Sequence, residues 1–342
     1  MKKVLLSLVA MMVATTSFAQ NTVVASLSHG TETTIFYGSN ALKDAVAAAE
    51  SGDVINLSAG TFYASDISKG ITLRGTGIDI DEPTYIVNDF VIEIPAEDTN
   101  RFIMEGIRCQ NWVRTKGSFD NPSFVKCQFN GVGNATESDA VKNILFTNCK
   151  ITGGINVGGD NSVFFINSFV AYISKYQNGT IMSKNSIHRQ PILSSLTQSI
   201  WSNCIFYPDK YSEHCLPADA QVTNCVAIGY AYDMFRGMIE HPNCKQFGNY
   251  QDVFKEYNGG YTDEQTFELN DEAKTTLLGT DGKEVGRPAP HEQTRARTDD
   301  HEQPAYQKDR VLKFTQRSHG LLSVGGHGCH RSAQRCPHRR PS

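Results

Sequence analysis

The chain has 342 residues, of which 39% are hydrophobic and 20% are charged, so its composition excludes a wholly disordered polypeptide. The formal charge of −4 divides into +2 in residues 1–19, −12 in residues 20–286 and +6 in residues 287–342. An acidic body of this kind excludes binding to nucleic acid or to an anionic membrane through bulk electrostatics.

The first residues have the pattern of a secretory signal peptide. Lys2 and Lys3 precede an apolar stretch over residues 4–13. Ser17 and Ala19 satisfy the small-residue rule of signal peptidase, which predicts cleavage after Ala19. The apolar stretch is too short to anchor the chain in a bilayer. We therefore expect an extracytoplasmic protein (periplasmic, cell-surface or secreted) with residues 1–19 removed and no membrane insertion.

Residues 41–50 have the pattern of a short amphipathic helix, and Ser39 and Asn40 are suitable residues to cap its start. Such a helix covers the open end of a stack of strands. Its predicted apolar face consists of Leu42, Ala45, Val46 and Ala49.

A short phrase recurs between residues 124 and 230: alternating apolar residues, then Asn, then Cys or Ser. Its Asn-to-Asn spacings are 19, 18, 18 and 21 residues. A unit this short, with Gly, Asn and Asp at its breaks, predicts one turn of a coil of parallel strands rather than a pair of helices. We therefore predict an all-β fold, a right-handed parallel β-helix (solenoid) over residues 20–286 with the short N-terminal capping helix.

The repeated Asn has a structural interpretation. Asn tolerates left-handed backbone angles at tight corners. In register, its side-chain amide is also able to bond the Asn of the turns above and below. The sequence predicts a structural ladder of Asn148, Asn167, Asn185, Asn203 and Asn224.

Residues 42–77 combine the helix, a Gly52-Asp53 turn and short strands that end at Gly residues. This order resembles the entry of pectate-lyase-like β-helix proteins. Residues 267–286 resemble the closing segment of secreted β-helix proteins from gut Bacteroidetes. The resemblance implies a right-handed β-helix whose partner is a polysaccharide.

Residues 287–342 differ from the rest of the chain, with nine Arg, six His and five Pro and no sustained apolar period. One interpretation is a basic tail that binds a partner. The other is a non-native end that a frameshift has put in place of the true C-terminus, and the resemblance does stop at Gly286. We expect this tail to be disordered under either interpretation.

Nine cysteines in an exported protein invite a disulfide framework. Four of them, however, occupy a repeat position that Ser168 and Ser186 also occupy, which favours inward-facing small residues. The bridges Cys127–Cys149 and Cys204–Cys225 remain alternatives, as does a pair outside the ladder, Cys215–Cys244. No CxxC or HxxxH spacing predicts a metal site.

The resemblance also implies the chemistry of a polysaccharide lyase, and the sequence contains candidate residues for it. A polysaccharide lyase acting on a uronate-containing glycan by β-elimination neutralises the carboxylate, often with Ca²⁺, and removes the adjacent proton with a basic side chain. Lys184 is the candidate base, and His188 or Arg189 the candidate neutralising group, in a loose likeness to the alginate lyase and chondroitinase B family. That family places acidic metal ligands just before its Lys, and residues 178–182 contain none, so the metal ligands stay unidentified.

Aromatic residues near the end of the coil are candidates for stacking on sugar rings or for covering its upper end. Three functional hypotheses follow: a noncatalytic β-helix that binds glycan on its lateral face, a polysaccharide lyase, and a structural scaffold or adhesin. The lack of an acid cluster in the central repeats favours the first. The candidate sugar-binding residues are Tyr207, Tyr211 and Tyr232.

Overall fold

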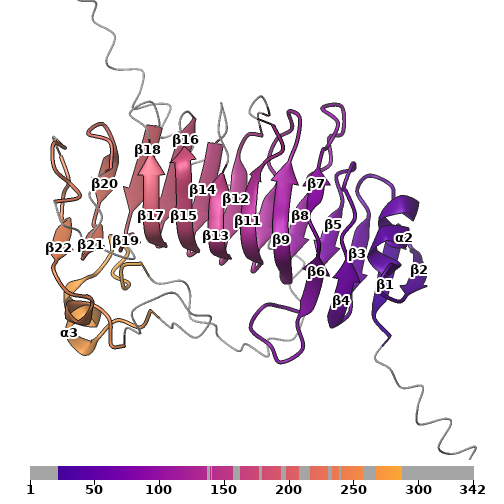
Figure 1. Cartoon of the computed structure of the whole chain (residues 1–342), viewed down its shortest axis with the longest axis horizontal. Coiled ribbons are helices and arrows are strands. Elements are labelled where there is room, and N and C mark those ends of the chain that lie inside the picture. The colour runs from indigo at the N-terminus through magenta and orange to yellow at the C-terminus, as the bar shows by residue number, and fades with distance from the viewer. Residues whose placement is uncertain are drawn as a thin grey trace, which may run out of the picture. The chain divides into compact units, whose positions relative to one another are not determined.

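The strands stack turn upon turn as a right-handed parallel β-helix of about nine turns, which confirms the predicted fold class (Figure 1). The predicted signal peptide and the tail from residue 287 lie outside the residues that the structure describes. The computed structural model describes residues 22–136, 139, 141–156, 162–176, 179–193, 198–207, 216–229, 233–238, 240–256 and 267–286.

Two sheets of eleven strands each form the walls of the coil. Sheet A contains, in spatial order, β2 (Glu32–Tyr37), β1 (Val24–His29), β3 (Val54–Leu57), β5 (Thr72–Arg74), β8 (Ile103–Glu105), β10 (Ser123–Val125), β12 (Ile144–Thr147), β14 (Ser162–Ile166), β16 (Thr180–Lys184), β18 (Gln198–Ser202) and β20 (Gln221–Thr223). Sheet B contains β22 (Lys245–Phe247), β21 (Val226–Ile228), β19 (Ile205–Phe206), β17 (Ile187–Leu193), β15 (Phe169–Tyr176), β13 (Lys150–Asn156), β11 (Gln128–Asn134), β9 (Ile107–Thr115), β6 (Thr84–Val87) and β4 (Gly60–Tyr63), and β7 (Phe90–Ile92) pairs with β9 beside this path.

From β8 to β20, a residue with positive φ forms the corner between each sheet A strand and the sheet B strand that follows it. The five Asn of the predicted ladder have φ between 50° and 55°. Amide side chains of adjacent turns bond to one another: Asn203 Nδ2 donates to Asn185 Oδ1 at 2.9 Å, and Asn224 Nδ2 donates to Asn203 Oδ1 at 3.5 Å. Asn243 (φ 58°) continues the series by one turn, 19 residues after Asn224. The Asn-Cys dipeptide at residues 243–244 was the sequence signal for this turn, and our repeat analysis missed it.

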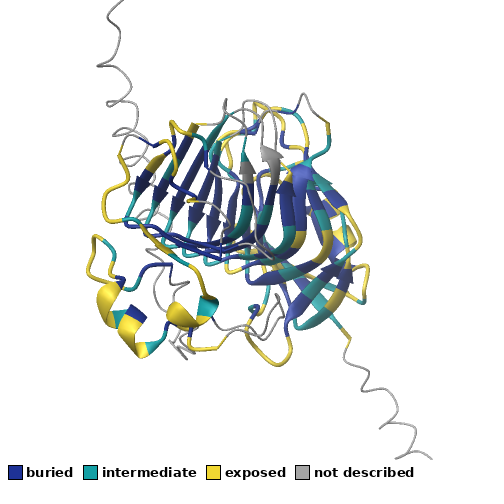
Figure 2. Cartoon of the chain, turned by 60° about the vertical axis from the view of Figure 1, so that its left-hand side comes forward, coloured by how far each residue is buried: buried dark blue, intermediate teal, exposed yellow. Residues whose placement is uncertain are grey.

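Inward-facing side chains form columns inside the coil, because the strands pair in register. In sheet A the rings of Phe124, Phe146 and Phe165 stack with centroids 5.0 and 5.4 Å apart. Phe129 of sheet B packs edge-on against the first two rings. The strands are therefore mainly buried, and exposed residues gather in turns and helices (Figure 2).

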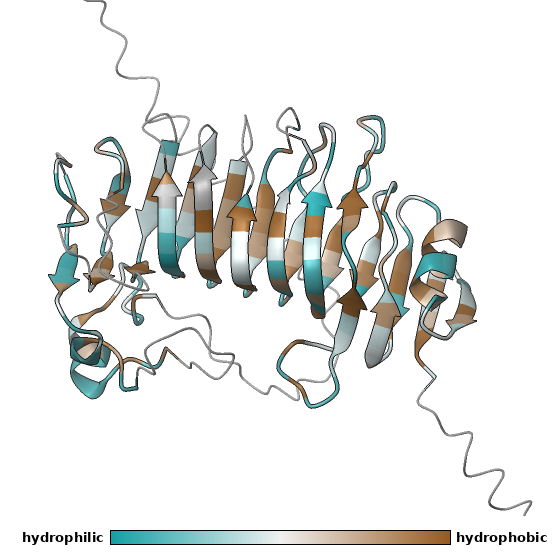
Figure 3. Ribbon diagram, in the orientation of Figure 1, coloured by the Kyte–Doolittle hydropathy of each residue, from teal (hydrophilic) through white to brown (hydrophobic). Residues whose placement is uncertain are grey.

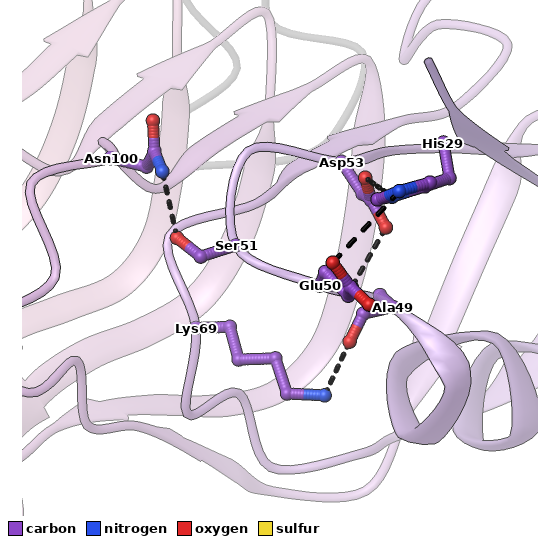
Figure 4. Close-up of polar contacts among 7 residues, drawn as sticks. All are labelled: His29, Ala49, Glu50, Ser51, Asp53, Lys69 and Asn100. Atoms are coloured by element: carbon purple, nitrogen blue, oxygen red, sulfur yellow. Dashed lines mark hydrogen bonds and ion pairs between the residues drawn. The ribbon is translucent and has the colours of Figure 1, made fainter. Parts of the chain in front are cut away.

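The N-terminal end of the coil is covered by α2 (Ala41–Ala48), which buries Leu42 and Val46 against the core as predicted. Asn40 precedes this helix, but its side chain makes no capping hydrogen bond. At the other end of the helix, Lys69 Nζ donates to the carbonyl of Ala49 (Figure 4). The antiparallel hairpin of β1 and β2 extends sheet A beyond the first turn, and the sequence analysis did not predict it.

His29 joins this hairpin to the first turn. Its Nδ1 lies 2.8 Å from Oδ1 of Asp53, and its Nε2 lies 3.9 Å from Oε2 of Glu50 (Figure 4). Asp53 Oδ2 also accepts the backbone N–H of Glu50 at 2.7 Å, which fixes the carboxylate. The hydrogen bond and the charge of Asp53 raise the pKa of His29 above its ordinary value of 6.5.

We predict that His29→Gln removes a pH-dependent part of the thermal stability. A raised folded-state pKa means that the stabilisation is complete below about pH 6.5 and is lost as the pH rises through the folded-state value. The Tm of the parent should therefore exceed that of His29→Gln at about pH 5.5, and this difference should shrink by about pH 9. His241→Gln removes an exposed imidazole elsewhere and serves as the control. An equal pH dependence in the parent and in His29→Gln would contradict the prediction.

A second hydrophobic core lies outside the coil. Several outward-facing side chains of β15, β17, β19 and β21 are apolar, and a C-terminal segment, described over residues 250–256 and 267–286, packs on them. This segment contains a 3-10 turn, η1 (Tyr250–Asp252), and the helix α3 (Asp271–Thr276), which begins with Asn270 Oδ1 accepting the N–H of Ala273 at 2.8 Å. The outward-facing side chains that it covers are Phe169, Ala171, Ile187, Ile205, Tyr207, Val226 and Ile228.

The end of the C-terminal segment is fixed on the Asn ladder. Gly286 donates its N–H to the carbonyl of Asn203 at 2.8 Å, and Thr280 donates its N–H to Asn203 Oδ1 at 3.3 Å. Gly286 has φ 67°, and a Cβ at this position would overlap the Ile205 side chain. Gly282 has a similar φ of 72°, but no atom lies within 4 Å of its Cβ position.

We predict that Gly286→Ala destabilises the protein more than Gly282→Ala. Both substitutions carry the left-handed backbone penalty of about 1–2 kcal/mol, and only the first adds a steric overlap with the covered sheet, which costs about 1–3 kcal/mol more. Urea unfolding of the two variants measures the difference. Equal losses of stability would show that residues 277–286 do not pack on β19 as described.

Candidate functional site

The candidate lyase residues lie on different walls of the coil. Lys184 is the last residue of β16 in sheet A, whereas Arg189 lies in β17 of sheet B, beyond the corner at Asn185. The residues paired with Lys184 in the adjacent strands are Ile166 and Ser202, neither of them acidic. The geometry therefore does not bring Lys184 and Arg189 onto one face, and it places no carboxylate beside Lys184 in those strands.

His188 points into the coil, which corrects its assignment as a neutralising group. Its side chain is fully buried in the inward column of sheet B, paired with Val170 and next to Phe206. Its Nε2 lies 2.7 Å from Oγ of Ser183 in the facing column. A polysaccharide on the outer surface cannot reach this imidazole, so His188 is a core residue in this structure.

A double-mutant cycle tests this buried pair. We predict that His188→Leu destabilises the protein by about 1–3 kcal/mol, because it leaves the buried Ser183 hydroxyl without its nitrogen partner. Adding Ser183→Ala should recover most of that loss, since removing both polar partners is close to neutral. Urea unfolding of the parent, the two single variants and the double variant measures the coupling. Additive losses would contradict the hydrogen bond.

Tyr207 is also buried, and so it is unavailable for stacking on sugar. It follows β19, is 1% exposed and packs in the second core with Phe254 and Phe267 at centroid distances of 6.2 and 5.5 Å. Tyr207 lies on the lateral wall of the coil, beneath the C-terminal segment, and so it does not cover the upper end of the coil either. Tyr211 and Tyr232 lie outside the described residues.

A different aromatic residue lies on the outer face of sheet B. Trp112 of β9 stands opposite Gly131 of β11, and a Cβ on that glycine would come within 2.7 Å of the indole ring. The ring therefore lies against the Gly131 backbone. Oδ1 of Asp89 accepts the backbone N–H of Trp112 at 3.1 Å, and the Arg114 guanidinium lies 5.5 Å from the centroid of the indole ring.

A second aromatic residue stands on the same face three strands away. Tyr172 of β15 is partly exposed at the edge of the second core, with the Arg189 guanidinium 5.4 Å from its ring centroid. Gly131 pairs with Gly154 of β13, so the row between the two aromatic residues is glycine. At about 4.8 Å per strand, the strands of Trp112 and Tyr172 are roughly 14 Å apart. We call the outer surface of β9, β11, β13 and the adjoining parts of β15 and β17 the open face.

The open face is basic within an otherwise acidic protein. Its five strands contain no Asp or Glu, and Figure 3 shows hydrophilic residues along β9 and β17. Asp89 lies outside these strands, and its carboxylate contacts the open face through a 3.7 Å ion pair with Arg114. The outward polar side chains of the face include Arg108, Arg114, Gln128, Asn130, Lys150, Asn156, Arg189 and Gln190.

Within the residues that the structure describes, no group of three or more His, Cys, Asp or Glu side chains is arranged to hold a metal ion. Neither described α-helix has the length and hydropathy needed to cross a membrane. Comparison of the chain with protein-family models, curated proteins and solved structures found no match.

Proposed function

We propose that this protein is an exported, polysaccharide-associated β-helix of the pectate-lyase-like kind that binds an acidic glycan on its open face without catalytic machinery. The observation that supports the proposal is the pair Trp112 and Tyr172, each with an arginine beside its ring, on a surface whose strands lack acidic residues. Aromatic faces bind the apolar faces of sugar rings, and arginine forms bidentate pairs with carboxylates. An extended sugar chain of several residues would be able to contact both aromatic residues.

The geometry favours this function over the lyase. A lyase requires a base, a neutralising cation and its carboxylate ligands on one surface. Lys184 lies on sheet A, Arg189 on sheet B and His188 in the core, as described above. The scaffold or adhesin hypothesis has no feature of its own to support it, whereas the open face carries a specific arrangement of side chains.

The test is binding of the full chain to a panel of acidic and neutral polysaccharides by calorimetry. Trp112→Ala should weaken binding to the preferred acidic glycan by about tenfold or more, as truncation of a central aromatic residue does in other interfaces. Arg189→Gln should weaken it at low salt more than at high salt. Tyr37→Ala removes an aromatic side chain that is 68% exposed on β2, far from the open face, and should leave binding unchanged.

Two results would reject the proposal. The first is unchanged affinity in both Trp112→Ala and Arg189→Gln, with circular dichroism showing that the variants fold. The second is the ultraviolet absorbance of an unsaturated sugar that accumulates with calcium, stops with chelator and disappears in Lys184→Ala. That second result would establish the lyase.

A further inference from the structure

A single column of sulfur and hydroxyl side chains runs along the corner of the coil beside the Asn ladder. The strand pairing in sheet B aligns the residues that directly precede its strands from β11 to β22. In order along the column these are Cys127, Cys149, Ser168, Ser186, Cys204, Cys225 and Cys244. Cys244 was predicted to lie outside this repeat. The pairing of Val226 with Lys245 instead places it directly beside Cys225, which corrects that prediction.

Neighbours in this column bond to one another. The N–H of Cys149 donates to Ser168 Oγ at 3.1 Å, and the N–H of Ser168 donates to Ser186 Oγ at 3.1 Å. At the end of the column the N–H of Cys225 donates to Cys244 Sγ at 3.4 Å. Serine and cysteine thus make the same contact, so a serine is a conservative replacement anywhere in the column.

One thiol of the column reaches solvent. All six described cysteines are free, and Cys244 alone among them is not buried. Its contact with Cys225 lowers the pKa of the Cys244 thiol, although desolvation opposes the shift. Burial raises the pKa of the Cys225 thiol well above its ordinary range. Cys244 is therefore the thiol best placed to react first with a reagent in solution.

We propose that Cys225 and Cys244 form a disulfide when the protein meets a small-molecule disulfide. Residues in register on adjacent strands are separated by about 4.8 Å, which lies inside the range of about 4.4–6.8 Å between the Cα atoms of bridged cysteines. The bridge replaces the N–H···S contact that already joins the two residues.

The chemistry is thiol–disulfide exchange and needs no other oxidant. The Cys244 thiolate attacks one sulfur of the small disulfide, forming a mixed disulfide and releasing one small thiolate. The Cys225 sulfur, having lost its proton to solvent, then attacks the Cys244 sulfur and releases the second thiolate. Two protein thiols are oxidised, and one small disulfide is reduced to two thiols.

The bridge would fasten the last turn of the coil. β22 is the terminal strand of sheet B and pairs only with β21 in the described part of the chain. It leads directly into η1 and the C-terminal segment that covers the outer face of the sheet. A covalent bond between Cys225 and Cys244 would keep this turn paired, and with it the beginning of the cover.

The test exposes the folded full chain to oxidised glutathione, blocks the remaining thiols by alkylation and maps the peptides by mass spectrometry. We expect a peptide pair joined through Cys225 and Cys244. In Cys225→Ser, Cys244 should remain as the mixed disulfide with glutathione, and in Cys244→Ser both Cys225 and Cys204 should stay reduced. Cys149→Ser, a matched change in a buried part of the column, should leave the Cys225–Cys244 bridge unaffected.

Three results would overturn the proposal: a bridge between Cys244 and Cys215, a bridge between Cys204 and Cys225, or Cys244 in the parent chain only as the mixed disulfide. Thermal unfolding under reducing conditions shows whether each variant is folded, so loss of the bridge is not confused with loss of the structure. Proteolysis tests whether the bridge fastens the turn. Cleavage after residue 244 should be slower in the oxidised parent than in the reduced parent, and Cys225→Ser should show no such difference. Equal rates in the oxidised and reduced parent would show that the bridge does not fasten the turn.

Discussion

The structure depends on the tight corner between the two sheets, repeated in register from turn to turn. A residue with positive φ turns the chain, and the Ser or Cys that follows bonds the backbone of the neighbouring turn. Because each corner is held by the next, successive strands stay aligned, and residues of one kind form columns. The stacked Phe rings, the Asn amides and the thiols are consequences of this one constraint.

Alignment also decides which parts of the outer surface are available. From β15 to β21 the outward column of sheet B that begins at Phe169 is apolar, and residues 250–256 and 267–286 cover it. From β9 to β13 the corresponding positions are polar, charged or glycine, and the described part of that segment does not cover Trp112. The outer surface of sheet B therefore has two parts. Burial of the part from β15 to β21 stabilises the fold, whereas the part from β9 to β13 is the one that we propose for binding.

The period of the sequence was sufficient to predict the coil and its capping helix, because Asn corners and alternating strands are local signals. The outward-facing core was harder to predict, since Phe169, Ile187, Ile205 and Val226 look like ordinary strand residues until a distant segment covers them. Tyr207 and His188 were misplaced for a related reason: a two-residue period places side chains on opposite faces, but a short strand beside a corner does not reveal which face is inside. Trp112 was missed because its significance comes from Gly131 on the next turn.

The same geometry explains why basic residues gather on a protein whose body is acidic. Within a parallel stack, like residues recur about every 4.8 Å, so an outward column of arginines would repel itself without a compensating partner. On the open face the cations are instead separated by glycine or amide rows, and two of them lie beside aromatic rings. Those rings stabilise each guanidinium through its contact with π-electron density. The strands of this surface contain basic but no acidic residues, which favours the binding of an acidic chain from solution.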